Sequence, residues 1–150
     1  MTSFLIRRAT NEDSAGIIDC LALAFAPFRE SYTPEAFLDT VLTAESLAMR
    51  LQEMTIFVAA DALGNVSGTI SCKVVGSVRG MAVRPEWQGA HLAADLLACA
   101  EEELRSAGCS TITLDTTEPL TRAARFYEKH GFQPSGRIPD FFGMPLVEYS

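Results

Sequence analysis

The amino-acid sequence predicts an α/β (α+β) protein in which helices pack on both faces of a mixed, mostly antiparallel sheet of six to seven strands. Three observations lead to this fold class. Strand-like and helix-like runs alternate along the chain, hairpin strands precede β-α-β units, and 150 residues with 48% apolar content can bury one core but not two. We therefore expect a single domain over residues 1–150, with elements in the order β-α-α-β-β-β-α-β-α-β-β.

One strand and two helices are expected before the hairpin. Residues 4–8 (FLIRR) have strand character, and Thr10 with Asp13 three residues later resembles a capping box that starts the first helix. The Thr33-Pro34 pair marks the start of the second helix. The apolar residues that then recur at roughly helical spacing are Phe37, Leu38, Val41, Leu42 and Leu47.

The middle of the chain is predicted to contain a hairpin, a further strand and a long helix. Residues 55–61 and 66–75 are β-type runs joined at the Gly64-Asn65 pair, and residues 77–83 form the next strand. Residues 88–106 then follow a helical pattern. The apolar face of this helix consists of Leu92, Leu96, Leu97, Ala100 and Leu104.

The last part of the chain is predicted to hold three strands and one helix. Residues 111–116 (TITLDT) form a short buried strand, and a proline opens a helix over residues 119–130 that stops at Gly131. Residues 132–137 and 144–149 are the final strands.

Charge and hydropathy indicate a cytoplasmic protein without a nucleic-acid or membrane partner. The formal net charge of −7 at pH 7 opposes binding to a phosphate backbone. The most apolar segment, residues 16–28, is interrupted by Asp19 and is shorter than the about 20 residues that span a bilayer. The first arginines follow an apolar patch, which is the reverse of a secretion signal.

The cysteines are scattered along the chain without a CxxC pair. This distribution predicts reduced, mostly buried thiols, and neither a disulfide framework nor a metal site. The four residues are Cys20, Cys72, Cys99 and Cys109.

The stretch RPEWQGAHLA, residues 84–93, joins a strand directly to a helix. The first N–H groups of a helix lack partners and attract negative charge, and the small residues Gly89 and Ala90 let a bulky anion approach the backbone. Arg84 and His91 are the nearby side chains that can add positive charge. From these residues alone, an anion site and an ordinary helix start both stay open.

A second stretch, RFYEKHGFQP at residues 125–134, places Tyr127 near the end of the following helix. The β-α-β connection brings this helix to the same edge of the sheet as the first stretch. Together the two segments resemble the GCN5-related N-acetyltransferase (GNAT) family, in which a helix ends with Tyr, two or three polar residues and Gly-Phe. The resemblance covers nearly the whole chain in element order. It implies the GNAT fold, an enzyme that transfers an acetyl group directly to a primary amine, and acetyl-CoA as cosubstrate without a metal.

The resemblance also implies which residues hold acetyl-CoA. In the family, the pattern (Q/R)xxGx(G/A) holds the pyrophosphate through backbone amides, and here it falls on Gln88, Gly89, Ala90, His91, Leu92 and Ala93. His91 stands where the family most often has Gly, and we expect a backbone conformation there that costs a non-glycine residue little. The fourth strand is implied to diverge from the fifth. The backbone that then holds the pantetheine and polarises the thioester carbonyl belongs to Met81, Ala82 and Val83.

Tyr127 is the expected general acid for the departing CoA thiolate. A phenol with a pKa of about 10 and a thiol with a pKa of about 8.5 are close enough for proton transfer. The alternative is a helix tyrosine that only packs on the core. Family members that carry a Glu or His base on the fourth strand have it at positions that match Ser77 and Arg79 here. Neither of these two residues can act as the base. We therefore hypothesise a water-relayed proton transfer to Glu118 or Glu30, or a weakly basic acceptor.

The acceptor, a small-molecule or peptide amine, is expected to meet residues from three parts of the chain. Phe28, Arg29 and Tyr32 lie between the first two helices and form either a substrate wall or a core anchor. Arg79 pairs either with an acceptor carboxylate or with an acidic side chain of the protein. Residues 140–146 (DFFGMPL) are expected as a loop that covers the pocket from the other side.

Other classes of protein fit the sequence less well. The chain has neither GxxxxGK(S/T) nor GxGxxG, which excludes a P-loop or Rossmann nucleotide enzyme, and no Cys/His spacing indicates a cysteine nucleophile. The remaining alternative is a non-catalytic acyl-CoA-binding or regulatory module on the same fold. Relatives commonly form homodimers, and we expect the final strand to provide such a contact.

Overall fold

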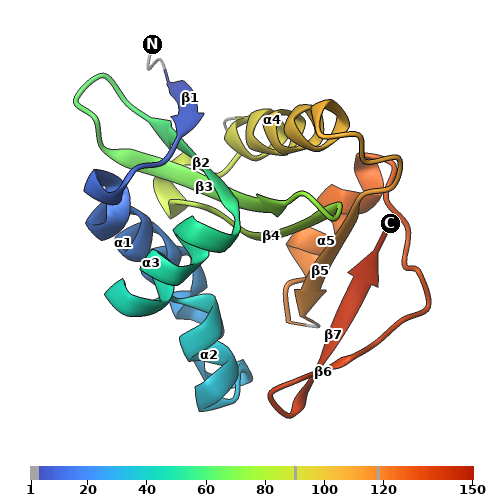
Figure 1. Ribbon diagram of the computed structural model, residues 1–150. Coiled ribbons are helices and arrows are strands. Elements are labelled where there is room, and N and C mark those ends of the chain that lie inside the picture. Colours follow the sequence, from blue (N-terminus) through green and yellow to red (C-terminus); the bar gives the residue numbers. More distant parts are fainter. Residues whose placement is uncertain (1–3, 90, 118) are drawn as a thin grey trace.

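The computed structural model describes residues 4–89, 91–117 and 119–150, which form a seven-stranded sheet in the order β1-β2-β3-β4-β5-β7-β6 (Figure 1). Strands β4 and β5 pair in parallel, and the other neighbours pair antiparallel. The strands are β1 (Leu5–Arg8), β2 (Thr55–Ala60), β3 (Val66–Lys73), β4 (Ser77–Val83), β5 (Thr113–Thr117), β6 (Asp140–Phe141) and β7 (Met144–Tyr149). The predicted mixed, mostly antiparallel sheet is confirmed.

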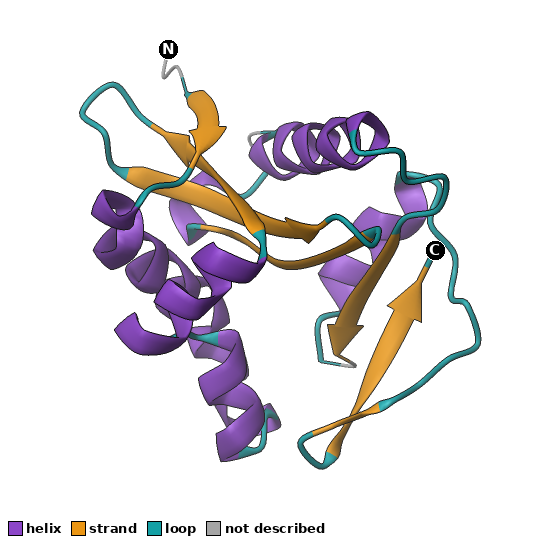
Figure 2. Cartoon of the chain, in the orientation of Figure 1, coloured by secondary structure: helices purple, strands orange, loops and turns teal. Residues whose placement is uncertain are grey.

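Helices cover both faces of the sheet, as predicted (Figure 2). Helices α1, α2 and α3 lie on one face, and α4 and α5 lie on the other. The α-helices are α1 (Ser14–Phe25), α2 (Pro34–Thr40), α3 (Ala44–Glu53), α4 (Leu92–Ser106) and α5 (Thr121–Lys129). The short 3-10 segments are η1 (Asn11–Asp13), η2 (Ala26–Ser31) and η3 (Pro85–Trp87). Within the described residues, none of these helices has the length and apolarity needed to cross a membrane.

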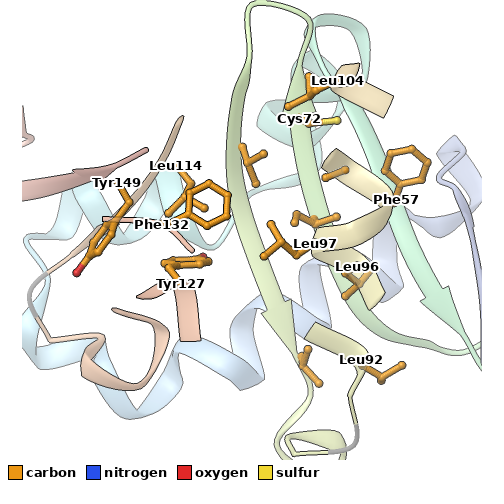
Figure 3. Packing of buried hydrophobic residues seen from close by; sticks show 14 of the residues in the cluster. Phe57, Cys72, Leu92, Leu96, Leu97, Leu104, Leu114, Tyr127, Phe132 and Tyr149 are labelled. Carbon is orange, nitrogen blue, oxygen red and sulfur yellow. The ribbon is translucent and has the colours of Figure 1, made fainter. Parts of the chain in front are cut away.

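Each layer of helices is fixed to the sheet by its own apolar cluster. One cluster lies between the sheet and helices α4 and α5 (Figure 3). The predicted apolar face of α4 is confirmed there, because its five residues are at most 3% exposed. The second cluster joins α1 and α3 to β2 on the opposite face, around Ile17, Leu47 and Val58. Burial in these clusters raises the pKa of the Cys20 and Cys72 thiols to about 11, so both stay protonated and unreactive at neutral pH.

Asp13 fixes the junction between β1 and α1. Its carboxylate accepts two hydrogen bonds of 2.8 Å from the guanidinium of Arg7 and one of 2.8 Å from the backbone N–H of Thr10. With the Thr10 side chain as reciprocal acceptor, the predicted capping box is confirmed. The hydrogen bonds from Arg7 are the main cause of a pKa of Asp13 below its ordinary value.

Asp13→Asn should lower the free energy of unfolding at pH 7 by about 1.5–3 kcal/mol, the usual contribution of a hydrogen bond to a charged group. Because the folded-state pKa is lowered, this stabilisation is fully present above the unfolded pKa of about 3.9 and is lost as the pH falls through the folded pKa. Urea unfolding at pH 7 and pH 3 measures the effect, with Glu12→Gln on the same exposed turn as control. A difference from wild type that is as large at pH 3 as at pH 7 would contradict this account.

The helix expected to follow Thr33 is interrupted, so the prediction of two helices before the second strand is wrong. α2 ends at Thr40, and Val41 has an extended ψ of 96°. Thr43 then starts α3 with its own capping box, in which Thr43 and Ser46 exchange backbone-to-side-chain hydrogen bonds of 2.9 and 3.2 Å. These side chains offer the backbone partners that compete with a continuous helix.

The strand predicted at residues 132–137 is also wrong. The segment makes one isolated bridge at Pro134, which has no N–H for a ladder, and Gly136 has a φ of +94°. It still runs along β7, because Gln133 and Ser150 exchange backbone hydrogen bonds of 3.0 and 2.9 Å. This edge of the final strand, where a homodimer contact was expected, is therefore covered by the chain itself.

β4 and β5 pair only at their first residues and then diverge (Figure 1). The two pairs are Ser77 with Thr113 and Val78 with Leu114. A bulge in β4 places Gly80 and Met81 opposite a single residue of β3, and such bulges bend a strand and increase its twist. The divergence predicted for these strands is confirmed. We call the space between them the wedge.

Candidate functional site

Two adjoining hollows open at the wedge. The larger, of about 410 Å³, lies between α1, the segment after β4, and α5; we call it the loop cleft. The smaller, of about 100 Å³, lies between β4, β5 and the α2–α3 region; we call it the wedge pocket. The two adjoin, since both are lined by Phe25, Met81, Leu120 and Ala123.

Most residues predicted to hold acetyl-CoA line the loop cleft. They are Met81, Ala82, Val83, Gln88, Gly89, His91 and Ala93. Leu92 points elsewhere, because its side chain is 3% exposed and belongs to the core cluster beneath α4. Ala90 lies outside the described residues.

The segment after β4 turns sharply before α4 begins. Gly89 has a φ of +86°, and His91, the N-cap of α4, has a φ of +67°. The expected low-cost conformation at His91 is therefore wrong, since the left-handed region costs a non-glycine residue about 1–2 kcal/mol. Histidine is among the residues that tolerate it best. Ala93 and Ala94 of the first turn of α4 line the cleft, and the N–H groups of a helix's first turn favour a negatively charged group.

Positive charge at the loop cleft comes from α5 and not from Arg84. The guanidinium of Arg84 forms a 2.8 Å ion pair with Asp19, so the expectation that it supports the loop is wrong. Arg122 donates a 3.0 Å hydrogen bond to the side-chain oxygen of Gln88, and Lys129 lines the same cleft. No sequence pattern indicated that Arg122 and Lys129 would lie at the cleft, because both cations look like ordinary solvent-exposed residues of an amphipathic helix.

Tyr127 joins the core to the wedge pocket. Its ring packs on Phe132 and Tyr149, with centroids 6.4 and 6.0 Å away, and 6% of the residue is exposed. The hydroxyl lies on the side of the ring that faces β4 (Figure 3) and the residue lines the wedge pocket. Burial, helped by the negative charge of Asp115, raises the pKa of Tyr127 above its ordinary value, so the hydroxyl stays protonated.

The three residues expected as a substrate wall are separated in the structure. Tyr32 lines the wedge pocket, and its hydroxyl lies 2.6 Å from the Thr117 side-chain oxygen. Phe28 lines the loop cleft instead. Arg29 is exposed over the ring of Phe37, 5.2 Å from its centroid, and does not lie with the other predicted acceptor residues in either hollow.

The other expected acceptor residues do reach the wedge pocket. Arg79 lines it and forms a 2.8 Å ion pair with Asp39, which is the salt bridge considered from the sequence. The segment 140–146 is a short hairpin rather than a loop, and its residues Phe141 and Leu146 line the pocket from the other side as expected.

The sequence did not indicate several polar residues that line the wedge pocket, and three of them, from β5 and α3, bear on its chemistry. They are Asp115, Thr116 and Arg50. Asp115 is half-buried; burial is the main cause of its raised pKa, Glu148 adds to it, and Arg79 opposes it. The alternating polar and apolar residues of β5 were the sequence feature that could have indicated Asp115.

Of the two carboxylates named as proton acceptors from the sequence, the one within the described residues does not lie in this pocket. Glu30 is exposed on η2 and lines neither hollow. Glu118 lies outside the described residues. The carboxylates that line the described pocket are Asp39, which is paired with Arg79, and Asp115.

Comparison with known sequences places these features in a family. The family described as Acetyltransferase (GNAT) family matches residues 17–132. An aminoglycoside N(6')-acetyltransferase type 1 of Stenotrophomonas maltophilia is 28% identical over 153 residues, covering 94% of this chain and 93% of the relative. An aminoalkylphosphonate N-acetyltransferase of Salmonella typhimurium is 36% identical over 61 residues, covering 41% of this chain and 40% of the relative.

Solved structures share the fold. A GCN5-related N-acetyltransferase from Rhodopseudomonas palustris superposes with a TM-score of 0.82 at 19% identity, covering 99% of this chain and 96% of that one. The PaiA N-acetyltransferase from Thermoplasma acidophilum, solved in complex with coenzyme A, gives a TM-score of 0.79 at 20% identity and covers 97% and 98% of the two chains.

Proposed function

The chain belongs to the GNAT family of acetyltransferases and is an acetyl-CoA-dependent acyltransferase; from this premise we propose that it transfers the acetyl group directly to a primary amine, with Tyr127 as general acid. The observation that carries the proposal is that the loop cleft adjoins the wedge pocket, with Met81 lining both. A thioester held in the cleft would thereby present its carbonyl to an amine in the pocket.

The loop cleft suits the parts of acetyl-CoA in turn. The first-turn amides of α4 and the side chain of Arg122 favour a pyrophosphate. β5 does not pair with β4 beyond Val78, so this edge of β4 could bond the pantetheine amides, although the Val83 carbonyl already accepts a 3.2 Å hydrogen bond from the Gln88 side chain. The acyl carbonyl would then lie at the wedge, where aligned N–H groups can stabilise the charge that develops on its oxygen.

Two side chains of the wedge pocket would move the protons. The buried hydroxyl of Tyr127 stays protonated and donates to the sulfur as negative charge develops on it. Asp115 takes the role that the sequence had suggested for Glu118 or Glu30: it accepts, through water, a proton from the ammonium form of the acceptor, and the neutral amine then attacks the thioester carbonyl. The need for such a base is large, because a neutral amine of pKa about 10.4 costs about 4.6 kcal/mol at pH 7.

The direct test measures thiol release from acetyl-CoA with primary amines of graded pKa, beside calorimetry of acetyl-CoA binding. Turnover with at least one class of amine is the expected result. Binding without turnover of any amine would replace the proposal with the non-catalytic acyl-CoA-binding module. The same samples, examined by sedimentation, determine whether the protein forms the expected homodimer.

Asp115→Asn should change the pH dependence of kcat/KM. If Asp115 accepts a proton from the ammonium form, kcat/KM for an amine of pKa about 10 is level from the raised pKa of Asp115 up to the amine pKa. In the variant only the neutral amine reacts, so kcat/KM should rise about tenfold per pH unit between pH 6 and 9. Parallel profiles for the two proteins would remove Asp115 from the proton transfer.

His91→Gly and His91→Val should separate backbone conformation from side-chain charge at the loop. Gly adopts the left-handed conformation freely, so His91→Gly should bind CoA within about threefold of wild type. Val is β-branched and disfavours a positive φ, so His91→Val should weaken CoA binding by about tenfold, equivalent to about 1.4 kcal/mol. Equal weakening in both variants, measured by calorimetry, would instead assign the contribution to the imidazole.

A further inference from the structure

The wedge pocket contains a buried cation that the proposed transfer does not use. Arg50 of α3 is 9% exposed, and its guanidinium lies against the backbone of β4, where a Cβ at Gly80 would be 3.0 Å from Nη1. The glycine therefore makes room for the guanidinium at the bulge. Burial of a long cationic side chain at this point is costly unless a partner compensates its charge.

The contacts of Arg50 with described residues compensate that charge only weakly. Nη2 donates a 3.3 Å hydrogen bond to the backbone carbonyl of Asp39, which carries no formal charge. The carboxylate of Asp39 is turned to Arg79, at 2.8 Å. Burial, and after it the charge of Arg79, lowers the pKa of Arg50 to about 10, while Asp39 and Glu53 act in the opposite direction. Two guanidinium groups thus line one pocket beside a single paired carboxylate.

The opposite wall of the same pocket carries negative charge. Asp115 lines it from β5, close enough to Tyr127 for its negative charge to raise that residue's pKa. The neighbouring Thr116 has a buried hydroxyl oxygen with no hydrogen-bond partner among the described residues. Negative charge and a free hydroxyl therefore lie on the β5 side, and positive charge lies on the α3 and β4 side.

We infer that the acceptor is a small zwitterion, in which an oxyanion binds Arg50 and Arg79 while the amine lies between Asp115 and Tyr127. The role of this zwitterion as acetyl acceptor rests on the proposed function. Its binding rests only on the residues of the wedge pocket. Guanidinium groups bind carboxylate and phosphonate oxygens with the same paired geometry, so the shared chemistry is an oxyanion near a primary amine. A pocket of about 100 Å³ holds a few heavy atoms, which favours a short chain between the two groups.

Calorimetry on the full chain saturated with CoA tests this directly, with three probes. 2-Aminoethylphosphonate and β-alanine carry a phosphonate or a carboxylate, and propylamine is of similar length without an oxyanion. We expect at least one of the two zwitterions to bind about tenfold or more tightly than propylamine, as a charge-assisted pair requires, and the stronger of them identifies the oxyanion. Propylamine binding as tightly as both zwitterions would overturn the inference.

Variants then assign the effect to Arg50. Arg50→Met keeps the aliphatic stem and should remove most of the preference for the zwitterion while leaving propylamine binding within about threefold of wild type. Arg79→Met should reduce the same preference, and Arg105→Met, an exposed arginine on α4, should leave it unchanged. Equal loss for zwitterion and propylamine in both pocket variants would give Arg50 and Arg79 a merely structural role and overturn the assignment. Should Arg50→Met fail to fold, Arg79→Met and the wild-type ranking decide the outcome.

Binding and turnover separate this inference from the proposed function. Zwitterion binding without thiol release from acetyl-CoA would contradict acetyl transfer and leave the oxyanion site in place. Thiol release with propylamine as fast as with the zwitterions would support acetyl transfer and contradict the oxyanion site.

Discussion

Tyr127→Phe should lower kcat for acetyl transfer by about 100-fold, the lower end of the contribution of a positioned general acid. Tyr127 lines the wedge pocket and its hydroxyl stays protonated, because burial raises its pKa, so removal of the hydroxyl leaves the departing sulfur without this donor. The ring, which packs in the core, remains. Affinity for CoA and the free energy of unfolding should therefore change little, which steady-state kinetics, calorimetry and urea unfolding can establish together.

Tyr149→Phe is the matched control for this substitution. Tyr149 is also buried in the cluster beneath α4 and α5, with its ring centroid 6.0 Å from that of Tyr127. Its hydroxyl points away from Tyr127 in Figure 3, and it does not line the wedge pocket. The control should keep kcat within about twofold of wild type, well below the effect of removing a general acid. A loss of kcat common to both variants would mean that core packing, and not the acid, limits the rate.

Gly76→Ala should destabilise the protein by about 3 kcal/mol, from about 1–2 kcal/mol for a left-handed non-glycine residue and about 1–3 kcal/mol for overpacking. Gly76 has a φ of +99°, and a Cβ there would lie 2.5 Å from the carbonyl oxygen of Thr111. The carbonyl oxygen of Gly76 itself accepts a 2.8 Å hydrogen bond from the backbone N–H of Thr113, next to the short pairing of β4 with β5. Thermal unfolding should show a decrease in Tm of about 6–12 °C for a chain of this size.

Gly64→Ala separates the two causes of that loss. Gly64 has a similar φ of +83°, but a Cβ there would have no atom within 4 Å. This control should lose only the about 1–2 kcal/mol of backbone strain. Equal destabilisation by the two substitutions would show that the contact with Thr111 is relieved at no cost.

The elements that could be predicted from the sequence depend on local patterns. The apolar face of α4, the capping box at Thr10 and the hairpin at Gly64 each lie within a few residues, and the structure has all three. The break before α3 had a local signature in the Thr43 and Ser46 cap, but the apolar spacing across it resembled one helix. The segment after Gly131 contains a proline and a further glycine, which weaken a strand even where the apolar content suggests one.

The residues of the site could be predicted only where they belong to a local sequence motif. The loop after β4 and Tyr127 belong to such motifs, and they line the two adjoining hollows. Arg50 and Asp115 belong to no such motif. Their environment is created by contacts between α3, β4 and β5, which lie far apart in the chain. A charged residue on a short helix is ordinarily solvated, and nothing near Arg50 in the sequence indicates that Gly80 leaves space for it.

The divergence of β4 from β5 has a consequence for the lifetime of the protein. Beyond Val78, β4 has no strand neighbour on the β5 side. A bound pantetheine chain would supply hydrogen-bond partners for the backbone groups on that side. Anything that binds only the folded state stabilises it by mass action, about 2.7 kcal/mol at a concentration 100 times Kd. The abundance of the folded enzyme would then rise and fall with the concentration of acyl-CoA. The ligand-free enzyme would unfold more often and would be degraded first by proteases.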